Sequence, residues 1–201
     1  MIVIIDYNVG NLKSVTNAFK RIGLETVVSR DHDVIRAADG IVLPGVGTFP
    51  VAMGNLEKFD LIDILNERKN AGVPILGICL GMQILFEKGN EIKETNGLGF
   101  LKGEVKLMEV DEKIPHMGWN EICFHHQHPL MNDIKEKDYV YFVHSYMAYP
   151  TDDELVAYCE YGDLKVTAVV AKDNVMGCQF HPEKSGAVGK KILLAFKEMI
   201  G

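Results

Sequence analysis

The chain has 201 residues, of which 47% are hydrophobic and 24% are charged, and its formal net charge at pH 7 is −7. This length suits one sizeable α/β domain and is short for two, so we expect a single domain over residues 1–201. The acidic balance argues against a nucleic-acid-binding protein, which normally carries a basic face. The longest nearly apolar stretch, residues 73–86, is shorter than the roughly 20 residues that a membrane span needs.

The N-terminal segment and the cysteines indicate a cytoplasmic protein. Residues 1–6 lack both the basic region and the long apolar stretch of a signal peptide. The four cysteines form no CxxC pair and no spacing typical of a disulfide scaffold. We therefore expect a reducing compartment and no contact with a membrane.

The first half of the chain alternates strand and helix patterns. The continuous apolar segment Ile2–Ile5 predicts a strand buried on both faces, and apolar residues at helical spacing predict a helix over residues 11–22. The following segments predict strands at 26–29 and 40–43, one or two helices over 51–71, and a buried strand at 74–78. This alternation predicts a doubly wound, mostly parallel sheet flanked by helices.

The second half predicts a succession of strands with short turns between them. They fall at residues 104–110, 119–124, 139–146, 155–161, 165–170 and 175–180. Short turns favour antiparallel pairing, so we expect these strands to extend the sheet in antiparallel fashion. An amphipathic helix over about residues 186–200 closes the chain, and the acidic segments 31–33 and 152–154 are expected to be solvated turns.

The segment Gly77-Ile78-Cys79-Leu80-Gly81 carries the clearest chemical signal. It has the form of a sharp strand-to-helix turn, where glycine is needed on both sides because a larger residue would crowd the bend. A helix that begins there directs its N–H groups and its positive dipole end at the sulfur, which favours the reactive thiolate. The pattern predicts that Cys79 is a nucleophile, rather than the core residue that a lone buried cysteine usually is.

A cysteine nucleophile needs a base, and the base needs a group that orients it. His181 and Glu183 flank Pro182, which biases His181 towards extended geometry. In an extended segment both side chains leave the same face. Glu183 could then accept a hydrogen bond from one imidazole nitrogen, which leaves the other nitrogen to take the proton of Cys79.

The glycine-rich segment Pro44-Gly45-Val46-Gly47 is a candidate oxyanion hole. It follows a predicted strand and precedes a predicted helix, and glycine allows the backbone to approach a substrate closely. We expect an N–H group of Val46 or Gly47 to act together with the N–H group of Leu80.

Together these segments resemble the class I glutamine amidotransferases, whose glutaminase domains use a Cys-His-Glu triad. The resemblance spans the whole chain. The segments 44–47, 115–120 (Pro-His-Met-Gly-Trp-Asn) and 141–146 (Tyr-Phe-Val-His-Ser-Tyr) are similar to those of the glutaminase subunits of imidazole glycerol phosphate synthases in histidine biosynthesis.

The resemblance implies roles for particular residues. Cys79 would attack the side-chain amide of L-glutamine, and His181 would take the thiol proton and return it to the departing ammonia. Water would then hydrolyse the γ-glutamyl thioester. The implied substrate-binding residues are Gly45, Gln83, His144, Ser145 and Tyr146. The loop 45–47 would be the flexible part of the oxyanion hole.

The resemblance also implies a partner, namely a barrel-shaped synthase (cyclase) subunit in a heterodimer. Ammonia would pass to it and be used to form imidazole glycerol phosphate and aminoimidazole carboxamide ribotide. The implied contact residues are Asn8, Asn11, Pro115, Met117, Trp119 and Asn120. No cofactor is implied. Residues 6–11 contain neither GxGxxG nor a P-loop lysine, so nucleotide binding is not expected.

Several residues have simpler interpretations. Cys123, Cys159 and Cys178 are expected to pack without a chemical role. The His125, His126 and His128 loop is interpreted as solvated, with no metal site, because neither a cysteine nor a carboxylate stands at ligand spacing. Trp119 could be a core anchor, and only the surrounding motif favours an interface.

Three alternative functions remain at this stage. The chain could be a glutaminase that serves another synthase, such as the anthranilate or pyridoxal phosphate system, which the 115–120 segment argues against. It could be a stand-alone cysteine hydrolase of a related fold, active without a partner. It could also be a regulatory module that keeps the fold, which the complete Cys79, His181 and Glu183 set argues against.

Overall fold

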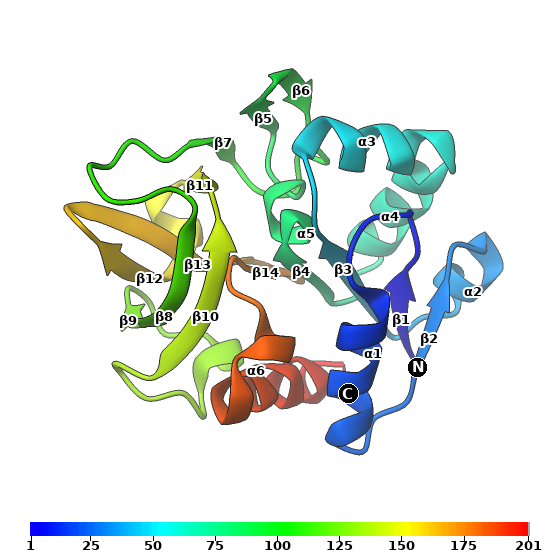
Figure 1. Cartoon of the computed structure of the whole chain (residues 1–201). Coiled ribbons are helices and arrows are strands. Elements are labelled where there is room, and N and C mark those ends of the chain that lie inside the picture. Colours follow the sequence, from blue (N-terminus) through cyan, green and yellow to red (C-terminus); the bar gives the residue numbers. More distant parts are fainter. Residues whose placement is uncertain (201) are drawn as a thin grey trace.

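An eight-stranded sheet forms the centre of the protein, in a computed structural model that describes residues 1–200 (Figure 1). Its five parallel strands lie side by side, and three antiparallel strands follow at one end. In spatial order the strands are β2 (Thr26–Ser29), β1 (Ile2–Ile5), β3 (Gly40–Gly45), β4 (Ile75–Cys79), β14 (Val175–Cys178), β13 (Leu164–Lys172), β12 (Leu155–Tyr161) and β9 (Cys123–Phe124). The predicted fold class is confirmed.

Helices cover both faces of the parallel part of the sheet (Figure 1). Alternate residues of β1 belong to two separate apolar clusters, because successive side chains of a strand point to opposite faces. Ile2 and Ile4 pack with α1 (Leu12–Arg21) and α6 (Gly186–Glu198). The other face packs against α2 (His32–Arg36), α3 (Phe49–Lys58) and α4 (Leu61–Asn70). This burial on both faces explains why β1 reads as a continuous apolar stretch.

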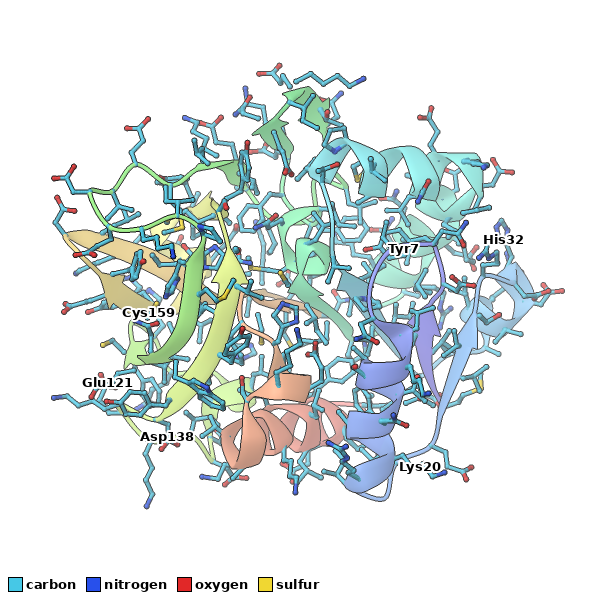
Figure 2. All side chains as sticks on the ribbon, in the orientation of Figure 1. Tyr7, Lys20, His32, Glu121, Asp138 and Cys159 are labelled. Atoms are coloured by element: carbon cyan, nitrogen blue, oxygen red, sulfur yellow. The ribbon has the colours of Figure 1, made fainter. Side chains whose placement is uncertain are left out.

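Charged side chains lie mainly on the outer surface of this three-layer arrangement. Lys20 and His32 project outward from their helices in Figure 2, and both are exposed. None of the helices within residues 1–200 combines the length and the apolar character that a lipid bilayer crossing requires.

The expectation that all strands of the second half extend the central sheet in antiparallel fashion is wrong, because β14 pairs parallel to β4 and several other strands form two smaller sheets. One pairs β10 (Tyr139–His144) with β8 (His116–Glu121), and the other has the order β11 (Tyr146–Pro150), β7 (Gly103–Leu107), β5 (Lys88–Glu91), β6 (Lys93–Asn96). The predicted single strand 139–146 is therefore wrong, because the chain changes sheets at Ser145. The β5–β6 hairpin was not predicted.

Three local predictions also need correction. The helix after Cys79, α5, is only one turn long (Leu80–Gln83), so its dipole is weaker than a long helix would give. Asp31 is not simply solvated, since its carboxylate accepts hydrogen bonds from the first turn of α2. Glu154 is buried and accepts hydrogen bonds from the Lys102 backbone and the Lys172 side chain.

Glycines bring the ends of β3 and β4 into close contact. In the parallel register Gly45 lies opposite Cys79. A Cβ atom on Gly81 would lie 1.8 Å from the Leu43 carbonyl oxygen, and one on Gly77 would lie 2.6 Å from the Gly81 oxygen. Both contacts are with backbone, which cannot move aside as a flexible side chain can. The turn after β4 can therefore fold back only because these positions lack side chains.

We expect Gly81→Ala to lower the free energy of unfolding by more than about 2 kcal/mol, because the new methyl group overlaps backbone. Urea denaturation measures this change. Gly54→Ala is the matched control, since Gly54 lies inside α3 with open space around it. It should stabilise the protein by about 0.5–1 kcal/mol through helix propensity. A Gly81→Ala protein as stable as the wild type would contradict the close approach.

Candidate active site

Cys79 ends β4 in a strained backbone conformation. Its φ is 54° and its ψ is −112°, a combination that residues with a side chain rarely adopt. The side chain is only 7% exposed. The turn places the sulfur at the carboxyl edge of the parallel strands, where open α/β sheets commonly bind ligands.

The parallel pairing of β14 with β4 brings His181 to the same edge. Cys178 lies opposite Ile78, so the residues after β14 continue beside Cys79. His181 Nδ1 lies 2.7 Å from Glu183 Oε1, and both side chains are 3% exposed. His181 is extended as expected, with a φ of −98° and a ψ of 99°, but the expected extended segment does not continue to Glu183, because Pro182–Lys184 forms a short 3₁₀ helix, η3. This turn still allows the predicted contact between imidazole and carboxylate.

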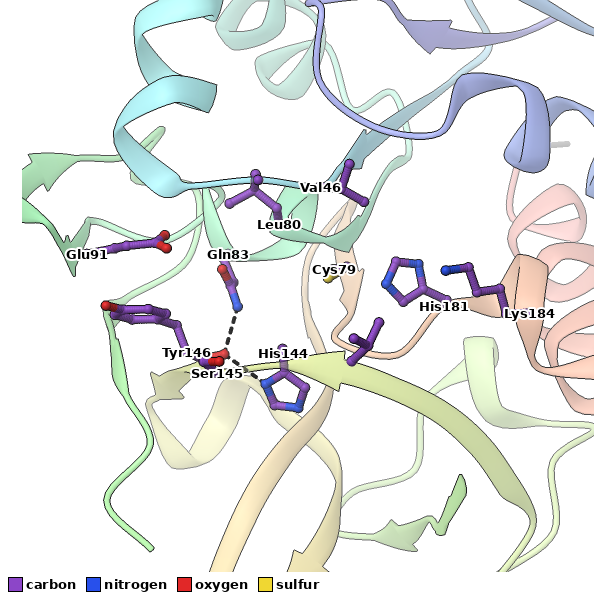
Figure 3. A pocket seen from close by; sticks show the side chains of 12 residues that line it. Val46, Cys79, Leu80, Gln83, Glu91, His144, Ser145, Tyr146, His181 and Lys184 are labelled. Carbon is purple, nitrogen blue, oxygen red and sulfur yellow. Dashed lines mark hydrogen bonds between the residues drawn. The ribbon is translucent and has the colours of Figure 1, made fainter. Parts of the chain in front are cut away.

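The electrostatic surroundings of His181 favour its protonated form. Burial lowers the pKa of His181, but the neighbouring Cys79 thiol and Glu183 carboxylate raise it, and the net pKa is about 9. Nε2 of His181 is buried and makes no hydrogen bond within residues 1–200. In Figure 3 the imidazole lies beside the Cys79 sulfur. The free nitrogen is therefore in place to exchange a proton with a group at the sulfur.

The glycine-rich segment after β3 forms the opposite side of the site. Val46 and Gly47 line the cleft, and Gly47 has a φ of 117°, which favours glycine. No hydrogen bond from the backbone N–H groups of Val46, Gly47 or Leu80 is found within residues 1–200. Gly45 does not line the cleft. It is buried against Gly81 and the Tyr7 hydroxyl, which donates a hydrogen bond of 2.6 Å to the Pro44 carbonyl.

These elements enclose a cleft of about 310 Å³ (Figure 3). Its lining residues are Val46, Gly47, Cys79, Leu80, Gln83, Glu91, Val143, His144, Ser145, Tyr146, His181 and Lys184. Glu91, Val143 and Lys184 were missed at the sequence level. Lys184 adjoins the His-Pro-Glu segment and could have been included, whereas nothing near Glu91 in the sequence marks it. The Glu91 carboxylate also accepts a hydrogen bond from the N–H group that begins α3.

A buried pair of amides connects the wall of the cleft to the sulfur. Gln83 Nε2 donates to the Tyr146 carbonyl at 2.8 Å and to Gln179 Oε1 at 2.9 Å. Gln179 Nε2 in turn lies 3.6 Å from Cys79 Sγ. Gln179, which is fully buried, was also missed. Its only signal was its position two residues before His181.

The expected partner-contact residues lie in two surface segments. Met117 and Trp119 in β8 are 60% and 52% exposed, so the alternative that Trp119 is a core anchor is wrong. Pro115 is exposed as well, whereas the Asn120 side chain bonds to His116. The other segment holds Asn8 and Asn11. Both are exposed, and they bind Arg30 and cap α1 respectively.

The fold places the Asp152 carboxylate beside the histidine loop, which the sequence spacing could not show. Asp152 lies 2.8 Å from His125 Nε2, and its carbonyl lies 3.1 Å from His126 Nε2. Within residues 1–200 these three are the only group of potential metal ligands whose atoms lie close together. All three are exposed, and the nitrogens that face Asp152 are already paired with it. All four cysteines are free, and Cys159 and Cys178 are buried.

Comparison with known proteins assigns the chain to a family. A family model described as "Glutamine amidotransferase class-I" matches residues 3–199. The chain belongs to the class I glutamine amidotransferases. Among its relatives, the imidazole glycerol phosphate synthase subunit HisH of Lactococcus lactis is 61% identical over 199 residues, 99% of this chain and 98% of the relative. The same subunit of Bacillus cereus is 49% identical, covering 100% of this chain and 95% of the relative.

Solved structures of other proteins share the fold. A protein described as glutamine amidotransferase has a TM-score of 0.79 at 18% identity, with 100% of both chains covered. PurLQS from Thermotoga maritima has a TM-score of 0.75 at 21% identity, covering 100% of this chain and 98% of that one. The expected family and enzyme class are confirmed: the protein is a glutamine amidotransferase of the HisH group. This membership argues against the stand-alone hydrolase and regulatory-module alternatives.

We expect Glu183→Gln to lower the pKa of His181 from about 9, because the substitution removes the charge that favours the imidazolium. NMR titration of the His181 ring protons measures it, with exposed Glu198→Gln as the control. Because the folded pKa lies above the ordinary 6.5, protonation of His181 stabilises the wild type fully below about pH 6.5. This contribution is lost as the pH rises through about 9. An unchanged titration in Glu183→Gln would contradict the assigned pair.

Proposed function

We propose that the protein is the glutaminase subunit of imidazole glycerol phosphate synthase, in which Cys79 forms a thioester with the side chain of L-glutamine. One observation carries the proposal. The fold brings Cys79 and His181 to one sheet edge, with Glu183 on the imidazole and unpaired N–H groups across the cleft. The 61% identity to a HisH subunit supports this choice of assembly.

The reaction begins when the Cys79 sulfur attacks the amide carbon of glutamine. His181 Nε2 holds the thiol proton, and Glu183 fixes the ring and stabilises its positive charge. The negative charge that develops on the carbonyl oxygen is held by the N–H group of Leu80 and by one from Val46 or Gly47. The imidazolium then gives its proton to the leaving nitrogen, so ammonia departs and the thioester remains. Water, deprotonated by His181, releases glutamate.

The cleft walls complement the rest of glutamine. The Glu91 carboxylate provides a negative charge for the α-amino group. Backbone groups of Ser145 and Tyr146, on the loop between β10 and β11, provide polar contacts for the α-amino and α-carboxylate end. Gln83 lines the same cleft and holds this loop through the Tyr146 carbonyl. Gly45 acts beneath the site, where it lets the loop approach the turn at Cys79.

The partner is the synthase (cyclase) subunit, which receives the ammonia and forms imidazole glycerol phosphate and aminoimidazole carboxamide ribotide. The exposed Met117 and Trp119 of β8 provide apolar contact area, since exposed aromatic side chains commonly anchor interfaces. Trp119 also stacks edge-on against Tyr141, with ring centroids 5.9 Å apart, which holds it in one orientation. Four free cysteines fit a cytoplasmic location.

We expect Cys79→Ala to lower glutamine hydrolysis by at least about 10⁴-fold, because no other group can form the thioester. Ammonia release is measured with and without the synthase subunit carrying a ligand. Cys123→Ser, which changes a cysteine outside the cleft, should retain wild-type activity. Activity that survives Cys79→Ala would overturn the mechanism. Full activity of the wild type without a partner would instead favour the stand-alone hydrolase.

We expect Trp119→Ala to weaken binding of the synthase subunit by about thirtyfold, as truncation of an aromatic anchor costs about 2 kcal/mol. Isothermal titration calorimetry with the purified partner measures the affinity. Tyr149→Ala serves as the control, because Tyr149 is also a partly exposed aromatic residue but lies in β11. Equal losses for both variants would place the partner elsewhere.

A further inference from the structure

Two buried histidines that the mechanism does not use, His144 in the wall of the cleft and His116 behind it, form a series of contacts. His116 Nε2 lies 2.7 Å from Asn120 Oδ1, and His116 Nδ1 lies 3.1 Å from His144 Nε2. His144 Nδ1 lies 2.8 Å from the Tyr146 carbonyl oxygen. All four ring nitrogens are therefore paired, and the chain ends on the loop that lines the glutamine cleft.

The packing around the two imidazoles leaves them little freedom. His116 is completely buried between Phe142 and Tyr161, with ring centroids 4.8 and 4.1 Å away. His144 is 7% exposed and meets the His116 ring edge-on. Stacking on both faces of His116 holds its plane, so the ring nitrogens cannot turn to other partners.

The Tyr146 carbonyl sets the direction of this chain. A carbonyl oxygen only accepts hydrogen bonds, so His144 Nδ1 must carry a proton. If both imidazoles are neutral, His144 Nε2 accepts, His116 Nδ1 donates and His116 Nε2 accepts. The Asn120 amide must then be rotated by a half-turn, so that its Nδ2 rather than its Oδ1 faces His116, and this rotation leaves the shape of the side chain unchanged.

Burial keeps both rings neutral. It lowers the pKa of His144 to about 3, despite the contact with the Tyr146 carbonyl that acts in the opposite direction. Burial likewise lowers the pKa of His116. Positive charge on His116 or on the nearby His181 lowers the pKa of His144 further. An additional proton, which would give one of the two rings a positive charge, is therefore unfavourable beside the protonated His181.

We propose that His116 and His144 are positioning residues, held as neutral Nδ1–H tautomers by Asn120, that fix the Tyr146 carbonyl and so the wall of the glutamine cleft. The carbonyl receives a second hydrogen bond from Gln83 (Figure 3). Two donors from different elements define its direction. The expected effect on glutamine binding rests on the proposed function, whereas the assignment of the tautomers is independent of it.

Nitrogen-15 NMR of the full-length chain with labelled histidine tests the tautomers directly. We expect His116 and His144 each to show a protonated Nδ1 and an unprotonated Nε2 at neutral pH. Assignment uses His116→Gln and His144→Asn proteins. A proton on Nε2 of either residue in the wild type would overturn the proposal, whatever the enzymatic activity.

The isosteric substitution Asn120→Asp tests the role of the chain. A carboxylate only accepts hydrogen bonds, so His116 Nε2 must then carry a proton. In one outcome the direction of every hydrogen bond in the series reverses, so that an unprotonated His144 Nδ1 faces the Tyr146 oxygen and two acceptors are in contact. In the other outcome one of the two rings takes up a further proton and becomes charged. We expect the KM for glutamine to rise about tenfold, with a smaller change in kcat. Exposed Asn132→Asp, with the same charge change, should stay within twofold.

A second pair of variants separates positioning from simple packing. His144→Asn keeps a side-chain N–H near the place of Nδ1, whereas His144→Ala removes it. We expect the alanine variant to raise the KM about tenfold and the asparagine variant to recover most of the wild-type value. All variants are assayed with the synthase subunit at a concentration that saturates activity, and thermal unfolding confirms that each is folded.

The outcomes separate this proposal from the proposed function. A wild-type chain with the expected tautomers but no glutaminase activity would refute the function and leave the tautomer assignment standing. A glutaminase in which Asn120→Asp and His144→Ala leave the KM unchanged would refute the positioning role. Equal losses for His144→Asn and His144→Ala would also refute it, because only packing would then matter.

Discussion

The parallel pairing of β4 with β3 on one side and β14 on the other is the constraint on which the site depends. It sets Gly45 opposite Cys79 and lets the chain after Cys178 run beside the sulfur. Three segments far apart in the sequence thus meet at the carboxyl edge of three adjacent strands. Because backbone hydrogen bonds define this register, a shift in pairing would separate Cys79 from His181 and from the glycine-rich loop.

Glycine makes this pairing compatible with a nucleophile at a turn. The backbone after Cys79 returns so close to β3 and β4 that methyl groups at positions 77 and 81 would overlap main-chain atoms. The positive φ of Cys79 itself is a local cost, which the packing of buried β4 and its neighbours offsets. The strain lies at the proposed nucleophile, whose largely buried sulfur the sharp turn brings to the cleft.

Nearly all buried polar groups around the cleft form hydrogen bonds with one another, and these bonds fix the orientations of the side chains. Gln83, Gln179 and the two histidines form hydrogen bonds that run from β8 to the sulfur. An unpaired buried polar group costs about 1–3 kcal/mol, so each member constrains the orientation of the next. His181 Nε2 and Glu183 Oε2 are the exceptions near the sulfur within residues 1–200. An unpaired imidazole nitrogen beside a nucleophile suits proton transfer.

The sequence alone determined the alternating α/β pattern, the turn at Cys79 and the local pair of His181 and Glu183, because each depends on residues that are neighbours in the chain. It could not place Glu91, Gln179 or the Asn120–His116–His144 chain, since strand pairing brings these residues together across long separations. The change of sheet at Ser145 was also missed, because residues typical of strands lie on both sides of it and no glycine or proline marks a turn there. Only the tertiary structure decided which strands are adjacent. Because the ends of adjacent parallel strands lie side by side, motifs that are separate in the sequence form one cleft.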